Sequence, residues 1–333
     1  MYLDDEQIEV VQDHVYLGTI ISESGERIKD MQDRMKKATS VANEIVQVCK
    51  ETELADVRLR YVKLLINACL DSKVKYGSAL WNILKRKKAI GDLNRMKPAL
   101  IKRVLQLPAS TPSDAILYEF GISDLSLEIL AEKVILAVET LNRNEDRIAT
   151  RLLKALLPKC VPGFCSEVLE VCKIFGISLN DFVGTDDVRM KLKLKVIEMQ
   201  KVELLKRMLI CSKMDKILVN GFHFDGRVRS YLVELDFEQA RAVFMTRFRM
   251  LPTKTNFPGR WSGTLCNVCG FEDTDAHLFV CPGYQDIITN DIWYDMFWDD
   301  SILNDTAQLK EAAKILLSVI QRLEQIQDIK FKI

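Results

Sequence analysis

Apolar residues recur at every third or fourth position over most of this chain, which is the period of an amphipathic α-helix. The first such series includes Ile28, Met31, Met35 and Cys49, and it predicts a helix that begins near Glu26. The same period predicts further helices over residues 54–69, 90–107, 125–141, 147–157, 188–210, 230–250 and 309–326. The pattern therefore predicts a mainly α-helical fold whose apolar helix faces form the core.

The N-terminal residues break this helical period. Residues 8–22 contain two runs rich in β-branched residues, which are separated by residues 12–14 and closed by Ser24 and Gly25. Such runs predict a short β-hairpin that leads into the first helix, with Gly18 inside its second strand. Two strands alone are rarely stable in water, so we expect the hairpin to pack on the helices or on another protein.

The most specific motif lies in LCNVCGFEDTDAHLFVCPGY, where Cys266, Cys269, His277 and Cys281 have the spacing Cys-x2-Cys-x7-His-x3-Cys. The first two cysteines have the spacing of a turn that wraps one metal ion, and the last two residues are one helical turn apart. Four such ligands with no open position are typical of structural zinc. The motif predicts one structural Zn²⁺; the alternative is three buried cysteines and a surface histidine.

The remaining cysteines and the hydropathy indicate the compartment. No apolar run is long enough to span a bilayer, and the N-terminus lacks the basic and then apolar layout of a signal peptide. A reducing compartment is therefore expected, where clustered cysteines bind metal more often than they form disulfides. The six cysteines outside the motif are expected to lie in the core: Cys49, Cys69, Cys160, Cys165, Cys172 and Cys211.

The charges are unevenly distributed, although 47 Lys and Arg balance 47 Asp and Glu. Residues 73–103 contain ten basic residues and one acid, Asp92, whereas residues 191–260 contain fifteen basic and seven acidic residues. Residues 271–333 contain five basic and twelve acidic residues. Such asymmetry indicates a polyanionic partner, but basic helix faces that are merely solvated give the same pattern.

Two basic stretches contain the candidate phosphate contacts. In the second stretch the basic residues alternate with Phe248, Phe257 and Trp261, whose rings can stack on bases. The alternative is that these rings lie in the core and the arginines cap helix ends. The predicted contacts are Lys85, Arg86, Lys87, Lys88, Lys102 and Arg103 in the first stretch, and Arg247, Arg249, Lys254 and Arg260 in the second.

Four segments resemble, in the same order, the C-terminal part of a non-LTR (LINE-type) retrotransposon reverse transcriptase. They are VYLGTIISESGERIKDMQDRMKKA, YVKLLINACLDSKVKYGSALW, VLQLPASTPSDAILYEFGISDL and TRFRMLPTKTNFPGRWSGTLCNVCGFEDTDAHLFVCPGY. The resemblance implies that Tyr16, Leu17 and Gly18 belong to the hairpin that ends the palm and grips the primer terminus. It also implies that the cysteine motif is a C-terminal CCHC zinc knuckle that helps to hold RNA or target DNA.

The same resemblance implies a division of the chain into five segments. These are a palm-end hairpin (1–25), a thumb-like helical domain (26–157), a helical connector with a basic face (158–260), the zinc knuckle (261–284) and acidic, aromatic C-terminal helices (285–333). RNA, DNA and a separate polymerase core are the implied partners, and neither a membrane nor a small-molecule substrate is expected. A nuclear location is inferred from where such an element acts; the alternative is the cytoplasm.

The opening residues Tyr2-Leu3-Asp4-Asp5 have the form of the Tyr-x-Asp-Asp carboxylates of reverse transcriptases. In the family this motif lies several tens of residues before the Tyr-Leu-Gly stretch, whereas ten residues separate Asp5 from Tyr16 here. Two-metal phosphoryl transfer also needs a third carboxylate and a nucleotide pocket. We therefore expect Asp4 and Asp5 to be turn residues, and the chain not to be an enzyme on its own.

The sequence leaves three hypotheses for function. The first is a nucleic-acid-binding fragment of such a reverse transcriptase, which lacks the catalytic palm and neutralises phosphates of a template and primer. The second is a non-catalytic protein-interaction module in a decayed or domesticated transposon remnant, which the net charge of zero supports. The third is a fragment that completes its fold beside a polymerase core. It predicts an exposed apolar edge at Val15, Leu17, Thr19 and Ile21.

Overall fold

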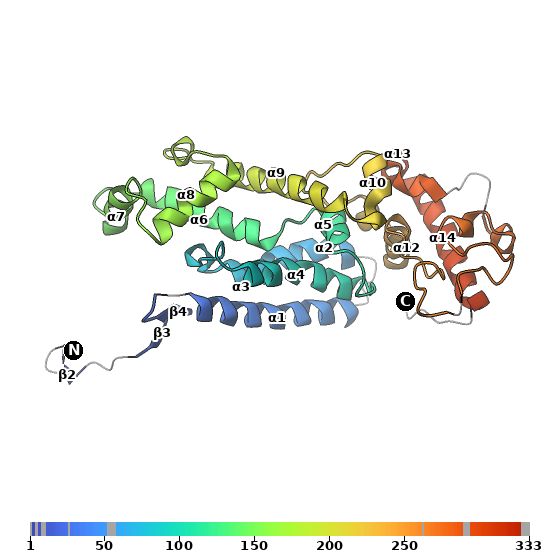
Figure 1. Cartoon of the computed structure of the whole chain (residues 1–333), viewed down its shortest axis with the longest axis horizontal. Coiled ribbons are helices and arrows are strands. Elements are labelled where there is room, and N and C mark those ends of the chain that lie inside the picture. Colours follow the sequence, from blue (N-terminus) through green and yellow to red (C-terminus); the bar gives the residue numbers. More distant parts are fainter. Residues whose placement is uncertain are drawn as a thin grey trace. The chain divides into compact units, whose positions relative to one another are not determined.

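The computed structural model describes residues 2–3, 6–7, 11–25, 27–51, 58–261, 263–288 and 294–327. Within these ranges the chain is mostly helical, as the apolar period predicts (Figure 1). It forms two compact units. Unit 1 comprises Met1–Ile45, Leu65–Lys97 and Ser123–Gln200, and unit 2 comprises Val46–Leu64, Pro98–Ile122 and Lys201–Ile333. Each unit gathers segments that are far apart in the sequence, so this division differs from the five consecutive segments expected from the resemblance.

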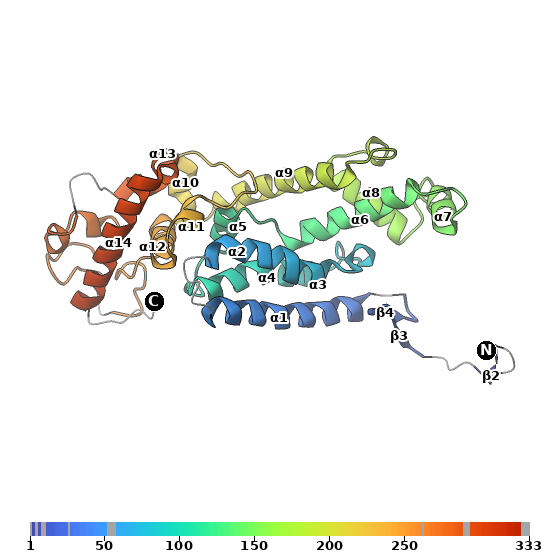
Figure 2. The same ribbon diagram turned by 180° about the vertical axis from the view of Figure 1, so that it is seen from behind.

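Helix α6 (Leu125–Leu141) lies within unit 1, where its neighbours cover it on several sides. It packs against η3 (Ser78–Leu80), α7 (Ile148–Leu156) and α8 (Phe164–Phe175), and α6 and α8 run side by side (Figures 1 and 2). Short elements complete the unit: the π-helical turn η2 (Ile66–Asp71), α3 (Ser72–Lys75) and η4 (Leu179–Asp181). Three long helices begin in unit 1 and end in residues of unit 2: α1 (Ile28–Glu51), α4 (Lys87–Val104) and α9 (Val188–Met208).

The N-terminal hairpin is present, but its turn is not where the sequence predicts it. Strands β3 (Asp13–Tyr16) and β4 (Thr19–Ser22) pair antiparallel, so Leu17 and Gly18 form the turn that the prediction had placed inside a strand. Both turn residues have positive φ, 47° and 77°, as in the type I′ turns that match the twist of paired strands. Glycine suits this turn, whereas leucine gives no signal for it. The strand expected before this hairpin falls largely outside the described residues, after the pair β1 (Tyr2–Leu3) and β2 (Glu6–Gln7).

A buried carboxylate, that of Asp30, joins the hairpin to the helices of unit 1. Asp30 accepts hydrogen bonds from the Ile20 backbone N–H at 3.0 Å and from Trp81 Nε1 at 2.8 Å. Because both donors are neutral, the charge of Asp30 is offset chiefly by nearby Arg34, whose Nε lies 3.9 Å from it. The hairpin thus packs on the helices, as its marginal stability alone requires.

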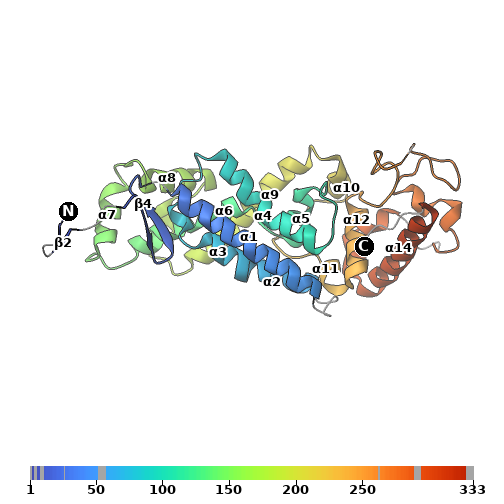
Figure 3. The same ribbon diagram turned by 90° about the horizontal axis from the view of Figure 1, so that it is seen from below.

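Unit 2 is built around α12 (Phe237–Arg247), which packs against α14 (Thr306–Gln327) (Figure 3). The sequence predicts one helix over residues 230–250, but the chain breaks between α11 (Tyr231–Glu234) and α12 because Asp236 caps α12, accepting the Gln239 N–H at 2.8 Å. The other helices of the unit are α2 (Arg58–Leu65), α5 (Ser113–Phe120), η5 (Ser212–Met214), α10 (Asp215–Val219), η6 (His277–Phe279), η7 (Pro282–Tyr284), η8 (Tyr294–Trp298) and α13 (Asp300–Asn304). Among the described residues, no helix combines the length and the apolar character needed to cross a membrane.

Candidate metal centre and basic surface

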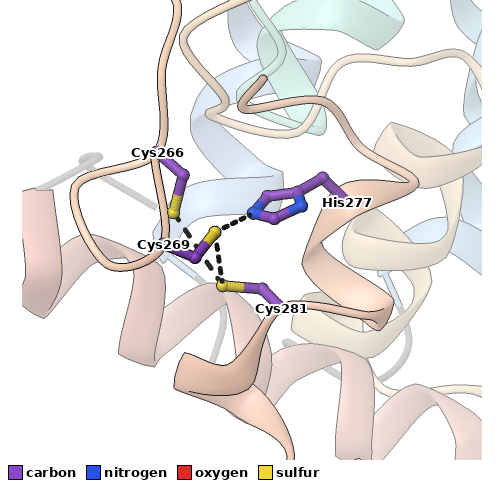
Figure 4. A group of neighbouring side chains, drawn as sticks. All are labelled: Cys266, Cys269, His277 and Cys281. Atoms are coloured by element: carbon purple, nitrogen blue, oxygen red, sulfur yellow. Dashed lines mark hydrogen bonds between the residues drawn. The ribbon is translucent and has the colours of Figure 1, made fainter. Parts of the chain in front are cut away.

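The four residues of the cysteine motif come together in unit 2, with their ligand atoms within 4.8 Å of one another (Figure 4). Cys281 Sγ lies 3.8 Å from Cys266 Sγ and 3.8 Å from Cys269 Sγ, and Cys269 Sγ lies 3.1 Å from His277 Nε2. A disulfide would bring two sulfurs to about 2.05 Å. Thiolate ligands at about 2.3 Å from a tetrahedral zinc have their sulfurs about 3.8 Å apart. The cluster is therefore compatible with one zinc ion.

The first two ligands lie on a tight turn that backbone hydrogen bonds close. The Cys266 N–H donates to Phe271 O at 2.7 Å, and the Gly270 N–H donates to Cys266 O at 3.1 Å. Gly270 has φ of 76°, a conformation that is strained for residues with a Cβ atom. The Val268 N–H also points at Cys266 Sγ, at 3.4 Å, and stabilises negative charge on this sulfur. The residues between the two cysteines thus supply both the bend and a donor to the thiolate.

The second pair of ligands flanks a short 3-10 turn instead of a full α-helical turn. His277 is the first residue of η6, and its N–H donates to Thr274 Oγ1 at 3.1 Å. Cys281 directly precedes η7, in which Pro282 takes the first position. Both side chains face the first pair of ligands (Figure 4). The spacing of four residues therefore brings His277 and Cys281 to the same site, as the sequence predicts. The connection is a 3-10 turn, which is tighter than the predicted α-helical turn.

The thiols of the cluster differ in acidity when no metal is bound. A hydrogen bond from the Phe271 backbone lowers the pKa of Cys269, whereas burial raises the pKa of Cys281 to about 12. Metal ligation requires the thiolate form of both residues. Binding of a metal ion would thus displace a proton from Cys281, and affinity would fall as the pH is lowered.

Two acidic residues of the loop between the metal ligands, Asp273 and Asp275, stabilise this loop by accepting hydrogen bonds. Asp273 Oδ2 accepts the Lys254 N–H at 2.9 Å and Gln327 Nε2 at 3.0 Å, and Asp275 Oδ1 accepts Asn256 Nδ2 at 2.7 Å. Both carboxyl groups are buried, and burial raises the pKa of Asp275 to about 7. Their structural role has no signal in the spacing of the motif.

The first basic stretch places three lysines on the surface of unit 1. Lys85, Lys87 and Lys88 are exposed, and in the part of the chain that the structure describes none of them forms an ion pair. Lys87 and Lys88 lie in the first turn of α4, and this turn contains no acidic residue. The N-terminus of a helix carries partial positive charge, so lysines there are unfavourable unless an anion is close. We call Lys85, Lys87 and Lys88 the α4 lysine cluster, which places positive charge at the start of this helix.

The other predicted contacts are less free. Arg86 is half-buried, and burial lowers the pKa of Lys102, whose Nζ donates to Ala109 O at 3.4 Å. Arg249 pairs with Asp215 at 3.0 Å. Arg103 and Arg260 are exposed. These residues remain at least partly exposed. Lys102 and Arg249 would have to give up an internal contact in order to bind a phosphate.

The interior position of Arg247 and Lys254 corrects the prediction that they contact phosphate. The Arg247 side chain is 2% exposed, and its Nε donates to Glu119 Oε1 at 3.0 Å. Lys254 is 7% exposed, and its Nζ donates to Leu265 O at 2.7 Å, next to the first cysteine ligand. Neither cation is available to a ligand in solvent. Both serve the fold, since Arg247 neutralises a buried carboxylate and Lys254 supports the metal loop.

The aromatic residues of the same stretch also divide between core and surface. Phe248 is fully buried and lies 4.7 Å from Phe244 between ring centroids, so it is a core residue and not a platform for a base. Phe257 and Trp261 are partly exposed. Trp261 Nε1 is buried without a hydrogen-bond partner among the described residues. Only the last two rings remain candidates for stacking.

The hairpin tip combines an anchored backbone with exposed side chains. Tyr76 donates from its hydroxyl to Leu17 O at 2.8 Å, and Arg34 Nη2 donates to Gly18 O at 2.6 Å. The side chain of Leu17 is nevertheless 72% exposed, and Tyr16 beside it is also exposed.

An apolar edge continues from this tip along the hairpin. Val15 and Ile21 are 64% and 40% exposed, whereas Thr19 is half-buried. The third hypothesis predicts an exposed apolar edge on the hairpin. This exposure is confirmed for Val15, Leu17 and Ile21. Asp4 and Asp5, which the sequence assigns to a turn, lie outside the described residues.

No protein-family model, no curated protein and no solved structure matches this chain.

Proposed function

We propose that this protein is a non-catalytic nucleic-acid-binding module equivalent to the C-terminal part of a non-LTR retrotransposon reverse transcriptase. The α4 lysine cluster is the observation that carries the proposal. Lys85, Lys87 and Lys88 are exposed and unpaired within the described residues, and two of them stand at the positive end of an 18-residue helix. A phosphate backbone supplies the anion that such an arrangement lacks.

The metal cluster has a structural role in this proposal. Three thiolates and one imidazole fill all four positions of a zinc ion and leave none for a substrate. Zinc binding contributes on the order of 10 kcal/mol to the folding of small zinc modules. The ion would therefore hold the turns around Cys266 and His277 in place, near Arg260 in the sequence, without contacting phosphate itself.

Affinity in this mechanism comes mainly from the release of counterions. The logarithm of the affinity for duplex nucleic acid falls with the logarithm of salt concentration, with a slope of about −0.9 for each phosphate that is neutralised. Lys85, Arg86, Lys87 and Lys88 belong to unit 1, and together they would give a slope of roughly −3.6 if each neutralises one phosphate of a duplex. Arg247 and Lys254 are not included, because both are buried.

The test is fluorescence anisotropy of the zinc-loaded protein with labelled RNA, single-stranded DNA and an RNA–DNA duplex over a salt series. We expect the double variant Lys87→Glu/Lys88→Glu to reduce the slope by about 2, since each phosphate-contacting lysine contributes about 1. The control is Lys310→Glu/Lys314→Glu, which makes the same charge change at two exposed lysines of α14. Equal slopes for the two variants, or wild-type affinity weaker than roughly 100 µM at moderate salt, would refute the proposal.

The hairpin favours a second function, docking onto a β-sheet such as that of a polymerase palm. Val15, Leu17 and Ile21 are exposed, and no further strand pairs with the outer edge of β3 among the described residues. The outer edge of β4 is occupied, because the Ile20 N–H donates to Asp30 and the Ile20 carbonyl oxygen accepts from Arg27. We expect Val15→Lys/Ile21→Lys to reduce self-association of the protein without lowering its helix content. Light scattering after gel filtration measures self-association, and circular dichroism measures helix content. A wild-type protein that stays monomeric at high concentration would argue against an unsatisfied edge.

A further inference from the structure

We propose that an apolar groove of unit 1 binds an acidic amphipathic helix of a partner protein, and that basic residues of α7 pair with the acids of that helix. The groove, which we call the α7 groove, lies where the ends of α6 and α7 meet the last turns of α8 and the loop that follows (Figure 1). It shares no residue with the α4 lysine cluster or the metal centre, so the inference does not rest on the proposed function.

The α7 groove has the size and the wall of a site for apolar side chains. Its volume is about 580 Å³, and pockets that bind ligands span about 300–1,000 Å³. Most of the wall is apolar, and its apolar residues are Leu141, Leu157, Pro158, Leu169, Ile177 and Leu179. Of these, Leu141, Leu169 and Ile177 are half-buried. Apolar side chains of a partner would remove this remaining surface from water, which is favourable.

The described wall carries positive charge and no acid. Lys154 and Lys173 line the groove, and both are exposed. The chain is described without a gap from residue 58 to residue 261, so every neighbour in sequence of the wall is included. Asp181, close in sequence, accepts the Ser178 N–H at 3.3 Å. Lys154 pairs with Glu145, but both side chains are exposed, and such a surface pair is readily exchanged for another carboxylate.

A row of basic residues extends from the groove along α7. Arg147, Arg151 and Lys154 are separated by three or four residues, so they lie along one face of the helix. Both arginines are exposed, and neither forms an ion pair within the described residues. The row is about 10 Å long, since an α-helix rises 1.5 Å per residue. It can therefore face acids that are one turn apart on a helix lying beside α7.

Apolar side chains are also exposed on α7, next to this basic row. Ile148 and Leu152 are one helical turn apart, and they are 73% and 54% exposed. The opposite face of α7, with Thr150 and Leu153, is buried. Contiguous apolar surface with a polar rim is typical of interaction sites. The groove and α7 thus combine apolar contact with a row of cations, as in proteins that bind an amphipathic helix in a groove.

The shape of the site favours a protein helix over other anionic partners. The surface of a bilayer does not enter a concave groove, and a phosphate backbone has no apolar side chains that could fill it. An amphipathic helix with leucines on one face and carboxylates beside them supplies both kinds of contact. Opposite charges on the two partners would also set the direction in which the helix lies on α7.

Fluorescence anisotropy of the full chain with a labelled peptide of about 16 residues tests the groove, the peptide having leucine at i, i+3, i+4 and i+7 and glutamate elsewhere. We expect it to bind at least about tenfold more tightly than two control peptides, one with lysine for glutamate and one with serine for leucine. Arg147→Glu/Arg151→Glu and Leu169→Glu should each weaken binding by about tenfold or more. Ile177→Glu serves as a second groove variant if Leu169→Glu fails to fold.

Lys36→Glu/Lys37→Glu is the matched control, because it makes the same charge change at two exposed lysines of unit 1, and it should leave peptide binding unchanged. Lys87→Glu/Lys88→Glu should also leave peptide binding unchanged while it weakens strand binding, so each proposal can fail separately. Equal affinity for the glutamate and lysine peptides, or binding that is insensitive to both the arginine and the groove variants, would overturn the inference. Binding of phosphatidylserine vesicles or of RNA that is lost in Arg147→Glu/Arg151→Glu, with no binding of the peptide, would overturn it as well.

Discussion

Leu17 has a backbone conformation that is costly for a residue with a Cβ atom, although its side chain gains almost no burial in return. Its φ is 47° and its side chain is 72% exposed. The left-handed region costs a leucine roughly 1–2 kcal/mol relative to glycine. The hydrogen bond from the Tyr76 hydroxyl to the Leu17 carbonyl oxygen helps to hold the backbone in this conformation.

Substitution Leu17→Asn tests whether this residue is strained. Asn-Gly is the preferred sequence for a type I′ turn. We therefore expect the variant to be more stable by about 1 kcal/mol in urea unfolding. Leu17→Val, which adds β-branching at the same positive φ, is the control and should lower stability. An Asn variant that is less stable than the wild type would show that the leucine side chain stabilises the fold.

The buried pair Arg247 and Glu119 leads to a second prediction at this scale. Removing one partner of a buried ion pair leaves an uncompensated charge and costs about 3–5 kcal/mol. Arg247→Met should have this effect, measured by urea unfolding, because it leaves the Glu119 carboxylate buried. Arg249→Met, two residues away, breaks a half-exposed pair with Asp215 and should cost only about 0–1 kcal/mol. Similar losses for both variants would contradict the burial of Arg247.

At the scale of elements, the metal loop depends on partners outside the motif. Its turns are short 3-10 segments, and its acids reach Asn256 and Gln327, which lie in the preceding loop and in α14. Lys254 binds the carbonyl oxygen of Leu265 from the same preceding loop. The metal centre is therefore joined to the packing of unit 2 and is not an independent finger.

Loss of the metal should consequently destabilise more than the loop. We expect the purified protein to contain one zinc per chain by elemental analysis, and cobalt replacement to give the visible spectrum of a tetrahedral thiolate site. Cys281→Ser should lower the zinc content and expose residues 263–288 to proteolysis. Cys172→Ser removes a buried cysteine of unit 1 and should retain the zinc. Full zinc content in Cys281→Ser would show that this residue is not a ligand.

At the scale of the whole molecule, local patterns predicted local features well. The period of three to four identified α1 and α6, and the spacing of Cys266 to Cys281 identified the metal cluster, since both signals lie within short segments. The burial of Arg247 and Lys254 was not predictable, because it depends on Glu119 and Leu265, which the fold brings close. The α7 groove was missed for the same reason, as its wall comes from the ends of α6 and α7, from α8 and from the loop that follows.

The interleaving of the two units has a consequence for synthesis. All segments of unit 1 have been made once residue 200 leaves the ribosome, whereas unit 2 also requires segments that follow. Domains tend to fold as units during synthesis. Residues 46–64 and 98–122 must therefore wait with uncovered apolar side chains such as Val62, Ile101 and Ile116, all fully buried in the finished protein. We therefore expect these side chains to stay exposed on the nascent chain until residues 201–333 have been made.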